Sequence, residues 1–344
     1  MNNPWPHRRD IWDVSFLTPL PAVRLARLRQ VATEQAISHA SQNLAWRPAN
    51  AEPILAEGTA VVRQSGAIGF SSHRLEAVEA IAGCGEEAVT LTLPPVVGEG
   101  PKRLAELARQ AQVTVACDHF AQVERLADAC QAVGSSINVL INIDVGRQRV
   151  GVRPGPDLSD FLQGLAGLRH IHLAGLSIAN NEIFDSGVGR LNQDEVQRVL
   201  RACRRALRQV DWGSMLLSVA CPGAFPDSGF RAVEARTPLS SSSDSPFAVV
   251  AGVIGRPTRD IAVIDAGVQE FRDATIAQNV PDGIHLEKMG DNFAVLKLGG
   301  VSQDLMIGDL VAFEIRALSS LRPASSVLIN ENGRWRVASP GAWR

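Results

Sequence analysis

Lysine and tyrosine are almost missing from this chain, and their scarcity limits the chemistry it can perform. The 344 residues include three lysines, Lys102, Lys288 and Lys297, and no tyrosine, so arginine supplies nearly all of the basic charge. A lysine amine is the usual group that forms an imine with a carbonyl compound. Because no lysine precedes Lys102, any imine chemistry would depend on one of these three positions.

Other absences exclude further classes of protein. The five cysteines lack CxxC spacing, which favours reduced, mostly buried thiols over a zinc site or a disulfide framework. No apolar run reaches the roughly 18 residues needed to span a bilayer, and the first residues do not resemble a signal peptide. A net charge of −2 indicates neither nucleic acid nor a membrane as partner. We therefore expect a cytoplasmic protein.

Short β-type runs alternate with helical patterns from about residue 25 to about residue 235, which is typical of βα units around a parallel sheet. Beyond a serine-rich stretch, helical periodicity gives way to strand-like runs separated by turn residues. The fold class predicted is α/β, with a (β/α)8 TIM-like barrel over residues 18–240 and an all-β domain over residues 241–344. Residues 1–17 are expected to form an arm that packs on the β domain or on a second subunit.

One segment is specific enough to indicate a family. The stretch from Asp144 to Val152 reads DVGRQRVGV, and Thr18-Pro19, Asp265-Ala266-Gly267 and Gly308-Asp309 occur in matching order. These residues resemble the fold-type III pyridoxal-phosphate (PLP) enzymes, in the D-threonine aldolase and D-serine dehydratase branch of the alanine-racemase-like group. The resemblance covers about residues 18–340 and implies a site at the carboxyl ends of the barrel strands.

Several positions depart from that family pattern. In the family the first barrel strand ends in RPHAK, and its lysine forms the Schiff base; here Arg47-Pro48-Ala49-Asn50-Ala51 places Ala51 at the lysine. The family's tyrosine after the sixth strand aligns with Ala179. Its two metal ligands, a His-x-Cys pair, align with Ala317 and Ser319. We therefore expect no covalently bound cofactor and no metal site.

The family's phosphate-binding loop is also reduced in this chain. It follows the seventh strand and is rich in glycine and threonine in the family, whereas here Ser218 to Ala224 reads SVACPGA. Pro222 lacks an N–H donor, but Ser218 and Gly223 remain, so non-covalent PLP binding is kept as a hypothesis. The family's RPG-containing loop is expected at the serine run 240–243.

Polar residues at the expected strand ends form the candidate site. Arginines there would hold a carboxylate or phosphate bidentately. The candidate ligand-binding residues are Arg47, Asn50, Arg149, Asn180, Asn181, Ser218, Gly223 and Asp265. The weaker catalytic candidates are His119, Cys221 and Asp144, and each has a structural alternative: a solvated loop histidine, an inert thiol, and a buried ion pair with Arg149.

Three interpretations of function stay open. In the first, the chain is a degenerate aldolase/dehydratase-like protein, a pseudoenzyme by family standards, repurposed to bind or transform an amino-acid-like or carboxylate small molecule without Schiff-base chemistry. In the second, it is a non-catalytic structural or regulatory partner of an active paralogue. The third is an ordinary PLP-dependent D-amino-acid aldolase, dehydratase or racemase, which requires the register at Ala51 to be wrong. The sequence leaves open whether any reaction is catalysed, and we expect a homodimer or a heterodimer with a paralogue.

Overall fold

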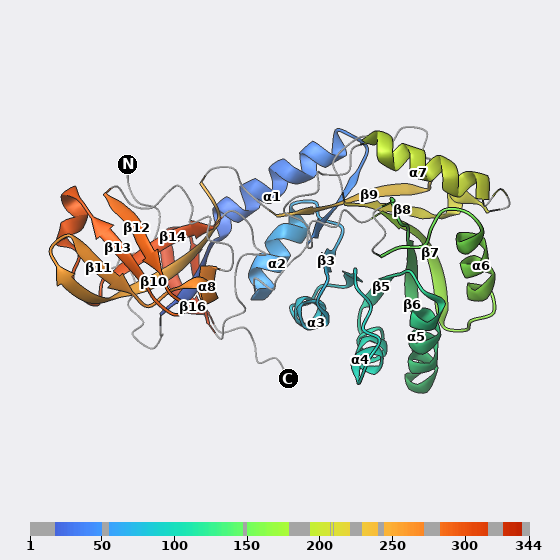
Figure 1. The fold of residues 1–344 in the computed structure, drawn as a ribbon, viewed down its shortest axis with the longest axis horizontal. Helices are drawn as coiled ribbons and strands as arrows, with labels where there is room; N and C mark the ends of the chain where they lie inside the picture. The colour runs from blue at the N-terminus through green and yellow to red at the C-terminus, as the bar shows by residue number, and fades with distance from the viewer. Residues whose placement is uncertain are drawn as a thin grey trace. The chain divides into compact units, whose positions relative to one another are not determined.

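The computed structural model describes residues 18–49, 55–146, 150–178, 193–206, 208, 210–220, 229–239, 244–271, 283–315 and 326–338. The chain divides into two compact units: Met1–Thr33, Glu52–Val62 and Pro238–Arg344 form one, and Glu34–Ala51 and Arg63–Thr237 form the other. Each unit is built on one eight-stranded sheet (Figure 1). We call the first the β unit and the second the barrel unit.

The sheet of the barrel unit is parallel and nearly closed. Its strand order is β2-β9-β8-β7-β6-β5-β4-β3. The two ends of this order approach each other, because Trp46 of β2 forms a parallel bridge with Ala67, which lies just before β3 in the chain. This arrangement confirms the predicted barrel. The strands are β2 (Ala45–Ala49), β3 (Phe70–Ser72), β4 (Ala88–Leu91), β5 (Gln112–Cys117), β6 (Ile137–Asn142), β7 (Ile171–Ile178), β8 (Leu216–Val219) and β9 (Ala232–Pro238).

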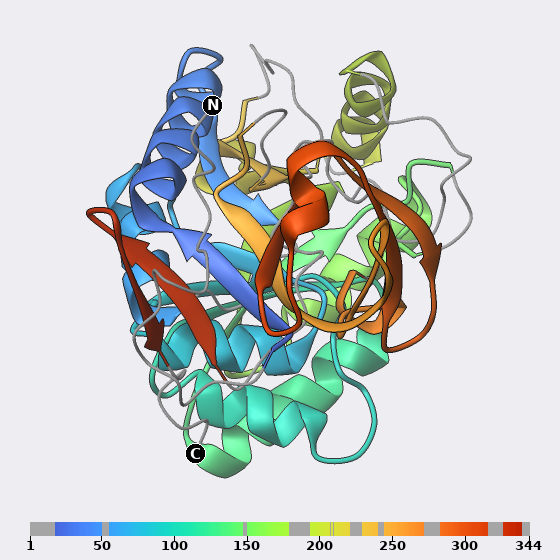
Figure 2. The same ribbon diagram turned by 90° about the vertical axis from the view of Figure 1, so that its left-hand side faces the viewer.

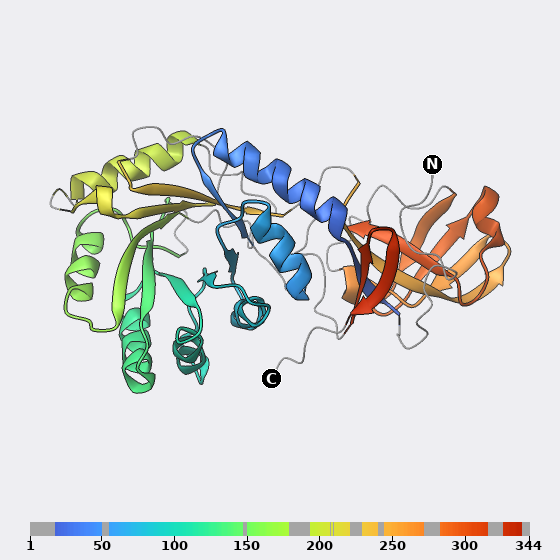
Figure 3. The same ribbon diagram turned by 180° about the vertical axis from the view of Figure 1, so that it is seen from behind.

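Helices alternate with these strands along the chain, and several lie outside the curved sheet (Figures 1 and 3). In order they are α1 (Leu25–Ala40), α2 (Leu55–Gln64), α3 (Leu75–Gly83), α4 (Gly100–Leu107), α5 (Phe120–Val133), α6 (Pro156–Leu165) and α7 (Gln193–Ala206). None of the helices within the described residues is long and apolar enough to cross a membrane.

Helix α5 shows how local sequence sets these boundaries. His119 accepts a hydrogen bond from the Ala121 backbone N–H, and the Gln122 side chain accepts one from the His119 N–H, so the first turn is capped from both directions. Gly134 ends the helix in the left-handed region, with φ of 70°. Val123, Leu126 and other apolar residues three and four apart are buried against the barrel.

A hydrogen-bonded cluster lies at the seam between β2 and β9. Trp46 Nε1 donates to Thr237 Oγ1 at 3.1 Å, and Thr237 Oγ1 lies 3.2 Å from His39 Nε2 on α1. His39 Nδ1 lies 2.7 Å from the Gln35 carbonyl oxygen, so Nδ1 carries the proton and Nε2 accepts from the Thr237 hydroxyl. Trp46 and Thr237 thus face α1. Because side chains alternate along a strand, their neighbours Arg47 and Arg236 face the barrel interior.

The sheet of the β unit has the order β12-β13-β11-β10-β1-β15-β16, with β14 also paired to β10. Strand β1 runs antiparallel to β10 and parallel to β15, so an early segment lies between two late ones (Figure 2). The mainly antiparallel sheet confirms the predicted β architecture. Its strands are β1 (Leu20–Arg24), β10 (Phe247–Thr258), β11 (Ile261–Ile264), β12 (Ile284–Met289), β13 (Ala294–Leu298), β14 (Leu310–Ile315), β15 (Val327–Glu331) and β16 (Arg334–Ala338), with a short helix α8 (Val268–Phe271).

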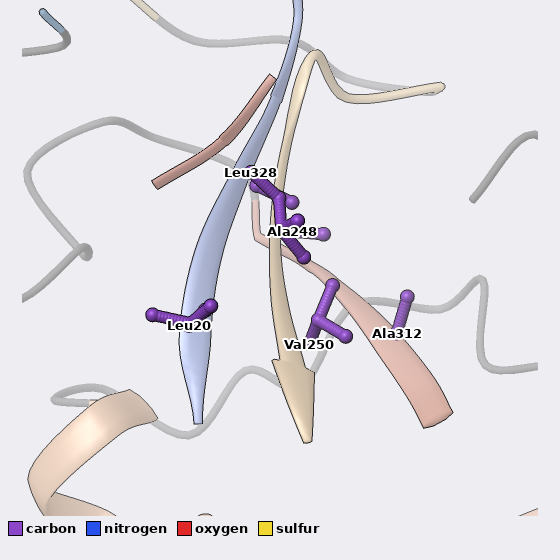
Figure 4. Packing of buried hydrophobic residues seen from close by; sticks show 6 residues of the cluster. Leu20, Ala248, Val250, Ala312 and Leu328 are labelled. Carbon is purple, nitrogen blue, oxygen red and sulfur yellow. The ribbon is translucent and has the colours of Figure 1, made fainter. Parts of the chain in front are cut away.

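The core of the β unit forms on one face of this sheet, where alternate residues of four strands meet (Figure 4). Ala22 of β1 is the register partner of both Ala248 and Leu328, and Val250 pairs with both Leu20 and Ala312. Because register partners share a face, β1 joins strands far apart in the sequence into one apolar layer.

The seam predicts a specific loss on mutation. Thr237→Val should lower the free energy of unfolding by about 1–3 kcal/mol, because it leaves the Trp46 N–H and His39 Nε2 buried without a partner. The check is the midpoint of urea unfolding followed by circular dichroism. Thr33→Val is the matched control, because the Thr33 hydroxyl bonds only the Arg29 carbonyl oxygen in an exposed position. Equal midpoints for the two variants would show that the seam contributes nothing.

Candidate functional site

Many of the predicted site residues lie outside the described residues, and their roles stay predictions. They are Asn50, Ala51, Arg149, Ala179, Asn180, Asn181, Cys221, Gly223, Ala317 and Ser319, together with the serine run 240–243. The described candidates are Arg47, Ser218, Asp144, His119 and Asp265.

Four neighbouring strands place polar side chains in one buried layer inside the barrel. Asn142 of β6 is the register partner of Ser177 on β7, Ser177 pairs with Ser218 on β8, and Ser218 pairs with Glu234 on β9. All four are buried, and the exposed fraction of Ser177, Ser218 and Glu234 is 0%. The interior at this level is therefore polar, unlike the apolar layers that usually fill such barrels.

Glu234 is the centre of this layer. Arg47 Nε donates to Glu234 Oε2 at 3.0 Å, and Ser218 Oγ donates to Glu234 Oε1 at 2.6 Å. The guanidinium of Arg47 also donates to the Ala88 carbonyl oxygen at 3.4 Å. It lies so close to Gly69 that a Cβ there would collide with it. The structure thus brings together two predicted ligand-binding residues, Arg47 and Ser218, and both are engaged by Glu234.

Arg236, which the sequence interpretation missed, is a second interior arginine. Its Nη2 donates to Ser177 Oγ at 2.8 Å, while its buried Nε has no hydrogen-bond partner among the described residues. The pKa of Arg236 is lowered to about 10, because burial lowers it more than the charge of Glu234 raises it, and the positive charge of Arg47 adds a smaller lowering. The guanidinium therefore stays charged at neutral pH.

Asp144 and His119 lie at the ends of β6 and β5, and both make local structural contacts. Asp144 Oδ1 accepts a hydrogen bond from the Gly146 N–H at 2.9 Å, while His119 Nδ1 accepts the capping hydrogen bond at the start of α5.

Near His119 is a hollow of about 360 Å³. Its lining residues are Asp118, His119, Phe120, Gly151, Val152, Arg153, Asp157, Asp160 and Phe161. Asp118 closes one side by accepting from the Gly151 N–H at 2.8 Å.

Asp265 lies in the β unit, where it has a structural role. Its Oδ1 accepts from the Gly252 N–H at 2.8 Å, and its Oδ2 accepts from the Thr18 hydroxyl. These bonds join the segment before β1 to β10. Its predicted role in ligand binding stays a prediction.

Three of the four cysteines that the structure describes are buried, and the fourth, Cys84, is half-buried. Cys117, Cys130 and Cys203 are buried and unpaired with one another, and burial raises the pKa of each. For Cys203 the pKa rises to about 12, so the thiol stays protonated at neutral pH. None of these three is a suitable nucleophile.

All three lysines can be located, and none lies on a barrel strand. Lys102 is on the exposed side of α4, where its Nζ lies 3.5 Å from Glu99 Oε2. Lys288 is on β12 and Lys297 on β13, both exposed in the β unit. Residues 45–54, which include β2 and the positions after it, contain no lysine. Among the described residues, no group of three or more ligand side chains is placed to hold a metal ion.

Comparison with known proteins identifies the family. Residues 25–223 match the family described as the alanine racemase N-terminal domain, which is more than half of the chain. The chain belongs to the alanine racemase N-terminal domain family. The matched residues include strands β2 to β8 of the nearly closed barrel and the segment from Asp144 to Val152.

Two curated relatives of this family member match over part of their length. A D-threonine aldolase from an Arthrobacter species is 25% identical over 202 residues, covering 49% of this chain and 51% of the relative. An alanine racemase from Desulfovibrio desulfuricans is 30% identical over 90 residues, covering 26% of this chain and 24% of the relative. The chain thus spans about half the length of one relative and about a quarter of the other.

Solved structures share the fold over nearly the whole chain. D-threonine aldolase from Filomicrobium marinum has a TM-score of 0.71 and 21% identity, covering 93% of this chain and 91% of that one. D-threo-3-hydroxyaspartate dehydratase from Delftia sp. HT23 has a TM-score of 0.66 and 19% identity, covering 95% and 98%. Alanine racemase from Bacillus anthracis has a TM-score of 0.70 and 13% identity, covering 95% and 99%.

The interior layer predicts an asymmetry between two glutamate substitutions. Glu234→Gln should destabilise the barrel unit by about 3–5 kcal/mol, because it leaves the buried Arg47 charge without its counter-ion. Glu57→Gln should change stability by less than about 1 kcal/mol, because Glu57 and Arg336 form an exposed ion pair of 2.9 Å. Urea unfolding of both variants tests this, and equal effects would contradict the central position of Glu234.

Proposed function

We propose that the chain binds an amino-acid-like or carboxylate-bearing small molecule at the carboxyl end of the barrel, without forming an imine to a lysine of its own. The observation that carries the proposal is the buried arginine layer in a barrel whose strands lack lysine. The printed names of the relatives point to the same ligand class, because each concerns an amino acid: D-threonine, D-threo-3-hydroxyaspartate or alanine.

The interior residues suit binding better than any particular reaction. Arg236 supplies a charged, planar donor group near the end of β9, and Ser177 supplies a hydroxyl at the end of β7. Such groups hold and orient a carboxylate. Burial raises the pKa of Cys117, Cys130 and Cys203, and His119 caps a helix, so none of these four residues is placed as an activated nucleophile.

A second candidate function is a PLP-dependent D-amino-acid aldolase, dehydratase or racemase. The named activities of the relatives favour it more directly than they favour a chain that has lost this chemistry. It requires an amine, and the sequence supplies that only through Lys102, Lys288 or Lys297. A third candidate, a non-catalytic structural or regulatory partner of an active paralogue, stays a proposal, as does the expected homodimer or heterodimer.

The two leading candidate functions predict different absorption spectra for the purified protein and different protein masses after borohydride treatment. If the chain forms no imine, the purified protein should be colourless, and borohydride treatment should leave its mass equal to that of the polypeptide. A chromophore fixed covalently by borohydride, seen by absorption and intact-protein mass spectrometry, would overturn the imine-free proposal and support the PLP enzyme.

The small number of lysines allows a decisive matched variant. In the triple substitution Lys102→Arg, Lys288→Arg and Lys297→Arg, every lysine is replaced while the net charge is kept. We expect this variant to bind D-threonine with the same affinity as the unmodified chain in isothermal titration calorimetry. Loss of binding or of a bound chromophore in the triple variant would assign a lysine to the site.

A further inference from the structure

Among the residues that the structure describes, the interior layer of the barrel carries one more positive than negative charge. Arg47 and Arg236 are both cationic, whereas Glu234 is the acidic member of the layer. The three residues together therefore carry one net positive charge. A buried charge is normally balanced by a counter-ion, because transfer out of water is unfavourable for an isolated ion.

Hydrogen bonding shows which arginine lacks a full set of partners. The two oxygens of Glu234 already accept from Arg47 and Ser218, at 3.0 Å and 2.6 Å. Arg236 reaches Ser177 through Nη2, but its Nε is buried without a hydrogen-bond partner in the described part of the chain. Asn142, next to Ser177 across the sheet, also has a buried side-chain oxygen without a partner there.

The position of Arg236 is suitable for a ligand that enters from the strand ends. Arg236 is two residues from the end of β9 at Pro238, and Ser177 is one residue from the end of β7 at Ile178. The alternation set by Thr237, which faces α1, directs Arg236 into the barrel. Its remaining donors thus lie inside the barrel near the carboxyl ends of the strands.

We infer that Arg236 is the anchor for a single carboxylate group of a small ligand, either a simple carboxylate or an amino acid. One negative charge balances the layer, and a planar carboxylate matches the fork of donors on a guanidinium. A phosphate dianion would instead leave the layer with an excess negative charge. The inference rests on the proposed function, since it names the ligand group that this site recognises.

Proton NMR on a mixture of acetate and acetamide tests the inference directly. The two probes are similar in shape, and only acetate is charged. We expect the transverse relaxation of the acetate methyl signal to be enhanced saturably by the full-length protein and that of acetamide to be unchanged. Arg236→Gln should weaken acetate binding at least about tenfold, because it removes both the charge and the fork. Arg201→Gln on the exposed face of α7 is the matched control and should leave acetate binding unchanged.

Two further measurements keep the result unambiguous. Arg236→Lys retains the charge without the fork, so it should fold and bind acetate more weakly than the unmodified chain. Inorganic phosphate serves as a competitor. If phosphate displaces acetate at a phosphate concentration lower than the acetate concentration, the site prefers phosphate. That result would overturn the inference that Arg236 binds a carboxylate. Equal relaxation of acetate and acetamide, or equal acetate binding by the Arg236→Gln and Arg201→Gln variants, would also overturn it.

Failure of this inference can be told apart from failure of the proposed function. If D-threonine binds to the unmodified chain and Arg236→Gln binds it equally well, the proposed function stands and the assignment of Arg236 is wrong. If acetate binds through Arg236 but no amino-acid-like ligand does, the anion site stands and the proposed function is wrong.

Discussion

The buried contact between Arg47 and Glu234 is the constraint on which the rest of the barrel interior depends. It joins the neighbouring strands β2 and β9, and the second oxygen of Glu234 accepts a hydrogen bond from Ser218 on β8. A charged pair in a barrel interior requires hydrogen bonds on every side, since its ions have lost their water. Ser218 and the Ala88 carbonyl oxygen supply such bonds to the pair, and Ser177 accepts one from the second interior arginine, Arg236.

Side chains on the outer face of β2 and β9 fix which residues of these strands face the barrel interior. His39, Trp46 and Thr237 hold the seam to α1 through one chain of hydrogen bonds. Since side chains alternate along a strand, this outer cluster and the inner charged layer are two results of a single register. A shift by one residue would place the arginines against α1 and the tryptophan inside the barrel.

The family of this chain and the positions of its lysines favour different functions. The fold belongs with proteins named for reactions of D-threonine, hydroxyaspartate and alanine, yet the three lysines lie on an outer helix and in the β unit. A fold carries many functions, and only the site decides between them. Under the proposed function, Arg236 recognises a carboxylate, which is the part of an amino acid that needs no imine.

The sequence by itself determined the barrel, the β architecture that follows it and the positions of all three lysines, because period-two and helical patterns and residue identity are local properties. It also placed Arg47 and Ser218 among the candidate ligand-binding residues at one end of the barrel. It did not reveal Glu234 or Arg236: in β9 these charged residues alternate with Ala235 and Thr237, a pattern more typical of an exposed strand. Only the tertiary structure decided that their face is the barrel interior, because that depends on which strands pair with β9.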